Sequence, residues 1–255
     1  MIISVINMSG GAVTDRQLHD RIRAVNRQLT YDFSPYWGFT AQLRLEGKTG
    51  RKKLGFDQAD MRGDAVLYIR KPVRPAADDG FHTAHFRGIP YGIVYLDLSA
   101  ELKEDWSVTL SHEALELVGD PELNLLVRGP HPTVKREVFH WFEMCDAVQS
   151  ESYEIDGIAV SNFVLPLYFT SGEELGGRND FLGTRAGKKP GKTLRSFSAN
   201  PGGYVTFFDP KTGRDRDWSP PESKKSKQRL SAKKKLGVGR GHRRRQRGVL
   251  VGGQV

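Results

Sequence analysis

Apolar residues recur along the chain with two periods, and these periods predict alternating strands and helices. Short β-branched runs and alternating apolar and polar positions predict strands at residues 2–8, 40–45, 64–70 and 91–98. Leu, Ile and Val at spacings of three and four predict a helix at residues 16–31, with Thr14 or Asp15 capping its N-terminus.

A second helix is predicted at residues 108–118, ended by Gly119 and Pro121. The order is then strand, helix, three strands, helix, which indicates a mixed α/β (α+β) fold with the second helix packed against a sheet.

Turn signals divide the second half of the chain. Residues 122–139 are polar and Pro-rich and predict a surface excursion, and residues 153–158 predict a hairpin with Asp156-Gly157 at its turn. A strand is expected at 159–164, a Gly-rich loop at 170–192 and a last strand at 204–208, with no regular structure beyond Trp218.

The second helix carries the motif LSHEALELVGDPE, which has the chemistry of a metal site. His112 and Glu116 lie one turn apart on one face, so both could bind one ion, with Glu113 beside them. The geometry is that of the metalloprotease helix HExxH with Glu at the second His, and Asp120 adds a third group. His and carboxylate are accepted zinc ligands. The alternative is a surface helix whose polar residues are solvated.

The segment FHWFEMCDAV, residues 139–148, places two acids among aromatic and sulfur-bearing residues. If Glu143 and Asp146 are buried they need partners, because an unpaired buried carboxylate costs several kcal/mol. A metal ion or a metal-bound His would be such a partner. The alternative is an exposed strand edge with both acids facing water.

Length and composition favour a soluble globular protein. The chain has 255 residues, 38% of them hydrophobic, which is long enough for a sizeable core. The single Cys145 excludes an intramolecular disulfide framework. The N-terminus shows no basic region followed by a long apolar run, and no segment approaches about 18 apolar residues. We therefore expect no export signal and no membrane span, and a cytoplasmic or virion-associated protein.

The positive charge is concentrated at the C-terminus. Residues 221–255 hold 12 Lys or Arg and one Glu, and since the net charge is +9, residues 1–220 carry −2. We predict a globular domain at residues 1–218 and a disordered basic tail at 219–255. Cations without aromatic residues suit binding to nucleic acid or another polyanion, and the residues expected to bind are Lys224, Lys225, Lys227, Arg229, Lys233, Lys234, Lys235, Arg240, Arg243, Arg244, Arg245 and Arg247. The alternatives are a solubilising extension and, third, membrane-surface binding.

Several separated stretches resemble a family of uncharacterised bacterial and phage proteins similar to zinc metallopeptidases. They are PYWG at 35–38, GFH at 80–82, GIP at 88–90, SHEALELVGDP, EMCDAV, YEIDGIAVSNFVLPLYF and GGY at 202–204. The resemblance covers residues 1 to about 210. Metzincin-like peptidases share the order of elements, and their HExxHxxGxxH pattern has Gly where Gly119 stands, whereas Glu116 and Glu122 replace its second and third His.

The resemblance implies a zincin-like mixed sheet and a zinc-dependent hydrolase acting on a peptide or protein. His112 and Glu116 would bind zinc and Glu143 would be the third ligand, with Asp120 and Asp146 as alternatives. Glu113 would be the catalytic base. His82 or His85 is a candidate for stabilising the oxyanion.

The rival hypothesis is a non-enzymatic structural protein, such as a virion component. It would keep the fold, bind nucleic acid through the tail and contact assembly partners.

Overall fold

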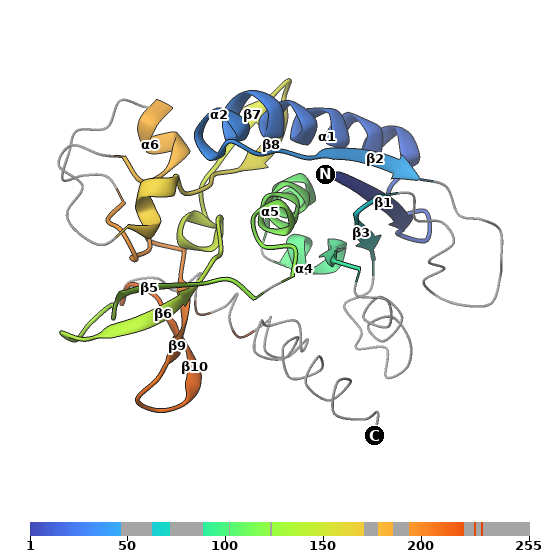
Figure 1. Cartoon of the computed structure of the whole chain (residues 1–255). Helices are drawn as coiled ribbons and strands as arrows, with labels where there is room; N and C mark the ends of the chain where they lie inside the picture. The colour runs from blue at the N-terminus through green and yellow to red at the C-terminus, as the bar shows by residue number, and fades with distance from the viewer. Residues whose placement is uncertain are drawn as a thin grey trace.

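The fold combines a four-stranded parallel sheet, a four-stranded antiparallel sheet, a two-stranded hairpin and several helices (Figure 1). The computed structural model describes residues 1–46, 63–71, 89–101, 103–122, 124–170, 178–185 and 194–221, with Lys227 and Ser231. The predicted mixed α/β architecture is confirmed in this coarse sense. The loop with His82 and His85 lies outside the described residues, as do the predicted nucleic-acid-binding cations of the tail other than Lys227.

Four strands form the parallel sheet in the order β2-β1-β3-β4. They are β1 (Ile2–Met8), β2 (Gln42–Glu46), β3 (Ala65–Arg70) and β4 (Tyr91–Tyr95). The predicted strand at 91–98 is too long, because its last residues begin the helix α4 (Leu96–Glu101). Asp97 lies in the first turn of α4, where a negative charge is favourable.

The first helical stretch runs beyond residue 31, where it was predicted to end, although the first α-helix itself ends at Arg27. α1 (Asp15–Arg27) begins with a capping box between Thr14 and Gln17. It runs on through a π-helical segment, η1 (Gln28–Phe33), into the short α2 (Ser34–Trp37). Pro35 does not end the helical stretch, because it lies in the first turn of α2, where no backbone N–H is needed for a helical hydrogen bond.

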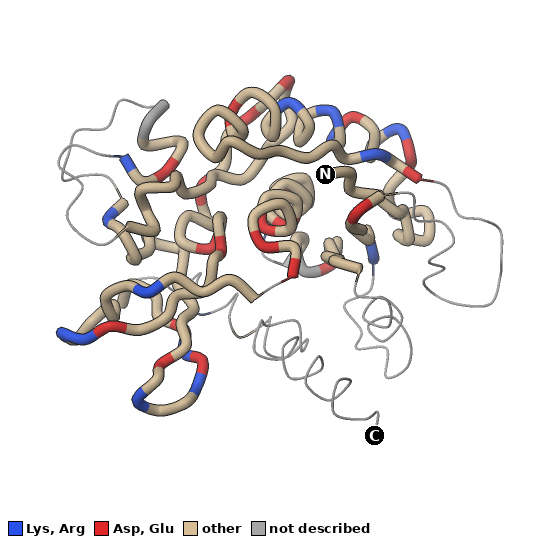
Figure 2. The backbone as a smooth tube through the Cα atoms, in the orientation of Figure 1, with Lys and Arg blue, Asp and Glu red and all other residues tan. Residues whose placement is uncertain are grey.

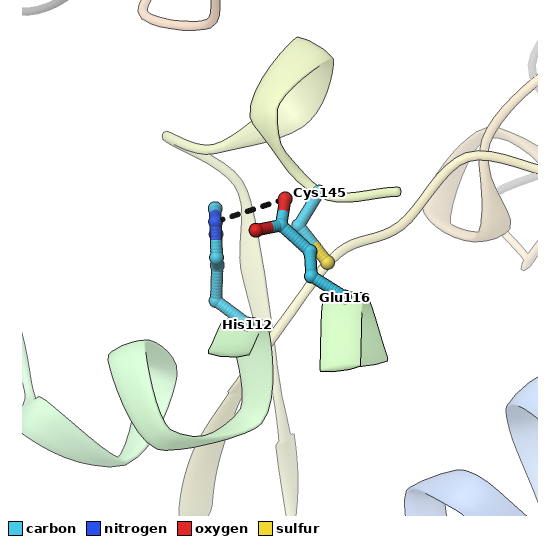
Figure 3. Close-up of side chains that lie close together, drawn as sticks. All are labelled: His112, Glu116 and Cys145. Carbon is cyan, nitrogen blue, oxygen red and sulfur yellow. Dashed lines mark ion pairs between the residues drawn. The ribbon is translucent and has the colours of Figure 1, made fainter. Parts of the chain in front are cut away.

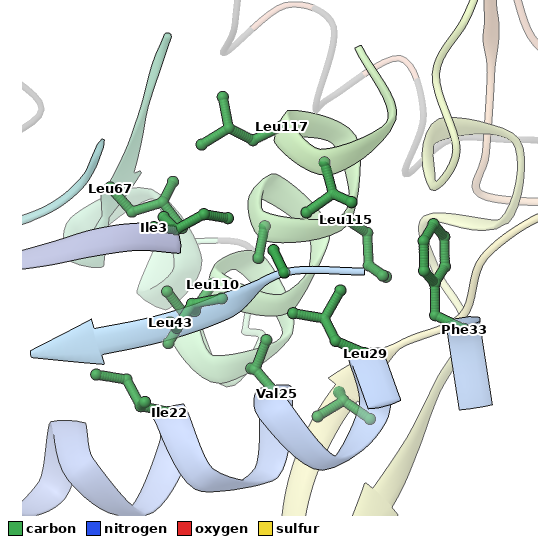
Figure 4. Packing of buried hydrophobic residues seen from close by; sticks show 14 of the residues in the cluster. Ile3, Ile22, Val25, Leu29, Phe33, Leu43, Leu67, Leu110, Leu115 and Leu117 are labelled. Atoms are coloured by element: carbon green, nitrogen blue, oxygen red, sulfur yellow. The ribbon is translucent and has the colours of Figure 1, made fainter. Parts of the chain in front are cut away.

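One face of the parallel sheet packs against both long helices, as Figure 4 shows. Alternate strand residues such as Ile3 and Leu67 join Leu18, Val25 and other apolar residues of α1 in a buried cluster. The cluster also includes Leu110 and Leu115 of α5 (Trp106–Gly119). This shared core fixes α5, the helix with the HExxE motif, against the sheet.

A hairpin holds the other side of α5. β7 (Ser152–Ile155) and β8 (Ile158–Ser161) pair antiparallel through the predicted turn. Asp156 and Gly157 both have positive φ, 52° and 75°, as a two-residue type I′ turn requires. The hairpin prediction is confirmed, and the following strand ends at Ser161 rather than at 164.

The second sheet has the order β10-β9-β6-β5. Its strands are β5 (Leu126–Pro130), β6 (Glu137–Trp141), β9 (Val205–Asp209) and β10 (Arg214–Trp218). The prediction of a surface excursion at 122–139 missed the β5–β6 hairpin, and β10 was also missed. The sequence of β10, RDRDW, has almost no apolar residue, and strand pairing rather than its own pattern makes it a strand.

The remaining short elements are η3 (Asp146–Val148), η4 (Pro166–Phe169) and α6 (Phe181–Arg185). α6 interrupts the loop predicted at 170–192. Within the described part of the chain, no helix has the length and apolar character needed to cross a membrane.

Candidate metal centre

The HExxE motif lies on a buried face of α5. Asp105 caps the helix by accepting a hydrogen bond from the Ser107 amide. His112 and Glu116 follow one turn apart and are only 4% and 7% exposed. The Nε2 atom of His112 lies 3.2 Å from Oε1 of Glu116 (Figure 3). The alternative of a solvated surface helix is therefore excluded.

The second part of the centre comes from the segment that follows β6. Glu143, Cys145 and Asp146 are all buried, so the alternative of acids on an exposed strand edge is also excluded. Oδ1 of Asp146 lies 3.4 Å from Nε2 of His112. Figure 3 shows the Cys145 side chain beside Glu116.

Gly119 permits this close approach. It is the last residue of α5, and a Cβ atom at this position would lie 2.4 Å from Cε and 2.7 Å from Sδ of Met144. Met144 itself is fully buried between Glu143 and Cys145. The glycine thus lets the segment that carries three polar groups pack directly on the end of the metal-site helix.

The donor atoms form two groups of three that share one residue. Ligand atoms of His112, Glu116 and Cys145 lie within 4.8 Å of one another, and so do those of Glu116, Glu143 and Asp146. Two ligands of a tetrahedral zinc ion lie roughly 3.3–3.6 Å apart, given bonds of about 2.0–2.2 Å. The distances from His112 to Glu116 and Asp146 are close to this range.

The electrostatics of the cluster suit a cation. Burial alone would lower the pKa of His112, but the negative charges and nearby carboxylate oxygens of Glu116 and Asp146 raise it to about 10. Without a metal, the imidazole would carry a proton to offset the acids. Its Nε2 nevertheless makes no hydrogen bond of acceptable geometry with any described residue. A buried nitrogen of this kind, surrounded by carboxylates, fits a metal ligand.

The thiol of Cys145 adds a soft donor. Its burial, followed by the nearby charge of Glu116, raises its pKa well above the ordinary value. The thiol is therefore protonated and inert unless a cation favours the thiolate. A set of nitrogen, oxygen and sulfur donors is acceptable to zinc.

Two tyrosines line the far side of the acids. Tyr204 is buried, and burial followed by the charge of Asp146 raises the pKa of its hydroxyl well above normal. Tyr168 has a raised pKa for the same two reasons. Together with Glu143 and Asp146, these rings border a small cavity of about 10 Å³. A cavity of this size has room for about one water molecule.

Glu113 lies beside the cluster and is only partly buried. Its Oε2 lies 3.6 Å from the position that a Cβ atom would take on Gly92 of β4. The carboxylate thus lies against β4, the last strand of the parallel sheet as described.

Asp120, considered in the sequence as an alternative metal ligand, bonds to the backbone just after α5. Its two carboxylate oxygens accept hydrogen bonds from the backbone amides of Asn124, at 3.0 Å, and Leu125, at 3.1 Å. It fixes the turn that leaves α5 and belongs to neither group of donors.

The structure therefore brings together His112, Glu116, Glu143 and Asp146 from the residues singled out in the sequence. The sequence did not lead us to consider Cys145 as a metal ligand, because it was noted only as a sulfur-bearing residue of the EMCD segment. Its place between Glu143 and Asp146 was the available signal.

Figure 2 shows the acidic residues of α5 near the centre of the fold, whereas the Lys and Arg residues of α1 lie on the outside.

Comparison with known proteins gives no relative: no family model, no curated protein and no solved structure matches the chain.

Proposed function

We propose that the protein is a zinc-dependent hydrolase of the peptidase class with a zincin-like fold. The observation that carries the proposal is the buried cluster in which His112 and Glu116 of α5 meet the Glu143–Asp146 segment. The resemblance of the HExxE and EMCD motifs to a zinc peptidase-like family adds support. The order of strand, helix, strands and metal helix is in keeping with such a fold.

His112 and Glu116 would hold the ion together with a third group from the Glu143–Asp146 segment. The ligand atom of Cys145 lies close to those of both His112 and Glu116, so Cys145 competes with Glu143 and Asp146 as the third ligand. When bound, zinc supplies Lewis acidity, which polarises a carbonyl group and lowers the pKa of a coordinated water. Anionic ligands would moderate that Lewis acidity.

Glu113 would act as the base. It follows His112 directly on α5, is partly exposed and lies against β4. Its carboxylate can take a proton from water and pass it to the leaving amine. β4 is the last strand of the parallel sheet among the described residues, and an extended peptide added beside it would suit a peptide substrate.

The basic tail supports a second, additional activity. Its twelve cations among residues 224–247 stand beside a single acid, Glu222. We propose that it binds nucleic acid or another polyanion by neutralising phosphates. In the full chain, glutamine at Arg243, Arg244 and Arg245 should flatten the salt dependence of nucleic-acid binding, and an unchanged slope would refute the tail's role.

The metal proposal is tested by zinc content. We would purify the full chain and the His112→Ala and Glu113→Gln variants, with His19→Ala as control because His19 is an exposed residue of α1. The wild type, the control and Glu113→Gln should retain zinc, and His112→Ala should lose it. Glu113→Gln should lose cleavage of a peptide library. Negligible zinc in every protein would overturn the metal site, whereas zinc without cleavage by the wild type would leave a structural ion.

A further inference from the structure

The candidate centre has more donors than one ion needs. A catalytic zinc takes three protein ligands and a water. Here His112, Glu116, Cys145, Glu143 and Asp146 converge, all less than 9% exposed. They divide into two groups of three that share Glu116, with Nε2 of His112 and Oδ1 of Asp146 3.4 Å apart across the groups.

We propose that the centre holds two divalent cations, with the carboxylate of Glu116 bridging them. This inference rests on the proposed function, since it assumes that the cluster binds metal. One ion would lie among His112, Glu116 and Cys145, and the other among Glu116, Glu143 and Asp146. A carboxylate has two oxygens and can bind one ion with each, which is how two-metal sites keep their ions about 3.5–4 Å apart.

The two positions differ in chemistry. The first offers nitrogen, oxygen and sulfur, a set that selects zinc. The second offers only carboxylate oxygens, which suit the harder ions Mg²⁺ and Mn²⁺. The ions should therefore load selectively rather than interchangeably.

Charge favours the second ion. Glu116, Glu143 and Asp146 bring three negative charges into a buried site. A metal-bound Cys145 thiolate adds a fourth negative charge. One divalent ion therefore leaves an excess of two negative charges, and a buried uncompensated charge costs several kcal/mol. Two ions make the site neutral.

Two further observations support metal binding in this cluster. His112 is only 4% exposed, and its Nε2 lacks a hydrogen bond of acceptable geometry and lies 3.4 Å from Asp146, so it points into the cluster. On the other side, the cavity of about 10 Å³ beside Glu143 and Asp146 has room for a water ligand. The hydroxyl of Tyr204 hydrogen bonds with Asp146 and orients it.

The test counts ions in the full chain. The protein is stripped with a chelator, loaded with one equivalent of Zn²⁺ and titrated with Mn²⁺, with free Mn²⁺ followed by electron paramagnetic resonance and total metal by mass spectrometry. We expect one zinc and one manganese for each chain. A wild type that binds one zinc and no manganese overturns the second ion but leaves the proposed function standing. A wild type that binds neither refutes both.

Two variants separate the positions. Glu143→Gln should keep one zinc and lose the manganese, whereas Cys145→Ala should weaken zinc binding at least tenfold. Glu137→Gln is the matched control, because Glu137 pairs with Arg128 on the exposed β5–β6 hairpin and should leave both ions in place. Circular dichroism checks that each variant folds. Retention of both ions by Glu143→Gln would contradict the assignment.

Discussion

The packing of Gly119 against Met144 makes a quantitative prediction about how the two halves of the centre are held together. In Gly119→Ala the new Cβ atom would lie 2.4 Å from Cε of Met144, whereas carbon atoms in contact prefer about 3.5–4.0 Å. The end of the methionine must therefore retreat by more than about 1 Å. Met144 is fully buried, so the retreat disturbs its neighbours Glu143 and Cys145.

The expected loss of stability follows from two opposing effects. Overpacking a filled core costs about 1–3 kcal/mol. Ala in place of Gly near a helix end returns up to about 1 kcal/mol. We expect Gly119→Ala to lower the free energy of unfolding by about 1–2 kcal/mol and to weaken zinc binding.

A double-mutant cycle isolates the contact. Met144→Ala should cost about 2–5 kcal/mol because it leaves a cavity. In the double variant the methyl group introduced by Gly119→Ala no longer clashes, so the loss should be smaller than the sum of the single losses by about 1–2 kcal/mol. Urea unfolding followed by circular dichroism measures each free energy. Additive losses would refute the claim that Gly119 is needed for the approach of Met144.

Three further substitutions test other parts of the account. Asp120→Ala should cost about 2 kcal/mol by freeing two backbone amides, and should keep the wild-type zinc content; loss of zinc with an intact fold would make Asp120 a ligand. Burial lowers the pKa of His140 to about 4, so its contribution to stability is complete above about pH 6.5 and is lost as the pH falls toward 4. His140→Phe should therefore reduce the loss of unfolding free energy between about pH 6.5 and 4 by up to about 3 kcal/mol. Identical dependence on pH in the wild type and the variant would show that His140 does not cause this loss. Gln28 accepts a hydrogen bond from Ser111 at 2.6 Å and donates to two further oxygens, so Gln28→Leu should cost about 2–3 kcal/mol in thermal or urea unfolding, and a change below about 0.5 kcal/mol would count against this network.

The sequence predicted the parallel half of the fold well, because the spacing of apolar residues within each strand and helix identifies it. The buried run at Ile2–Met8 and the amphipathic spacing of α1 need no knowledge of the partner element. The Asp156-Gly157 pair also predicted its hairpin, since few other residues accept two positive φ angles.

The second sheet was not predictable in this way. β10 is a charged strand whose pairing with β9 depends on the tertiary fold, and β5 contains Gly129 and Pro130. Such strands have weak intrinsic preference, and their cross-strand neighbours determine them.

The candidate site was predictable residue by residue but not in its final grouping. The helical period alone placed His112 beside Glu116, whereas the apolar surroundings of Glu143 and Asp146 left burial and an exposed strand edge as open alternatives. The packing of Gly119 on Met144 decides which atoms of the EMCD segment come near α5. That contact joins residues about 25 positions apart, so local pattern could not assign a place to Cys145.

The most direct test of the account is X-ray absorption at the zinc edge of the full chain purified without added metal. Zinc held by the buried cluster should show nitrogen and oxygen neighbours at about 2.0–2.2 Å and one sulfur at about 2.3 Å, and Cys145→Ala should remove the sulfur. A protein that retains no zinc, or zinc surrounded by water oxygens alone, would contradict the claim that His112, Glu116 and the Glu143–Asp146 segment form a metal centre.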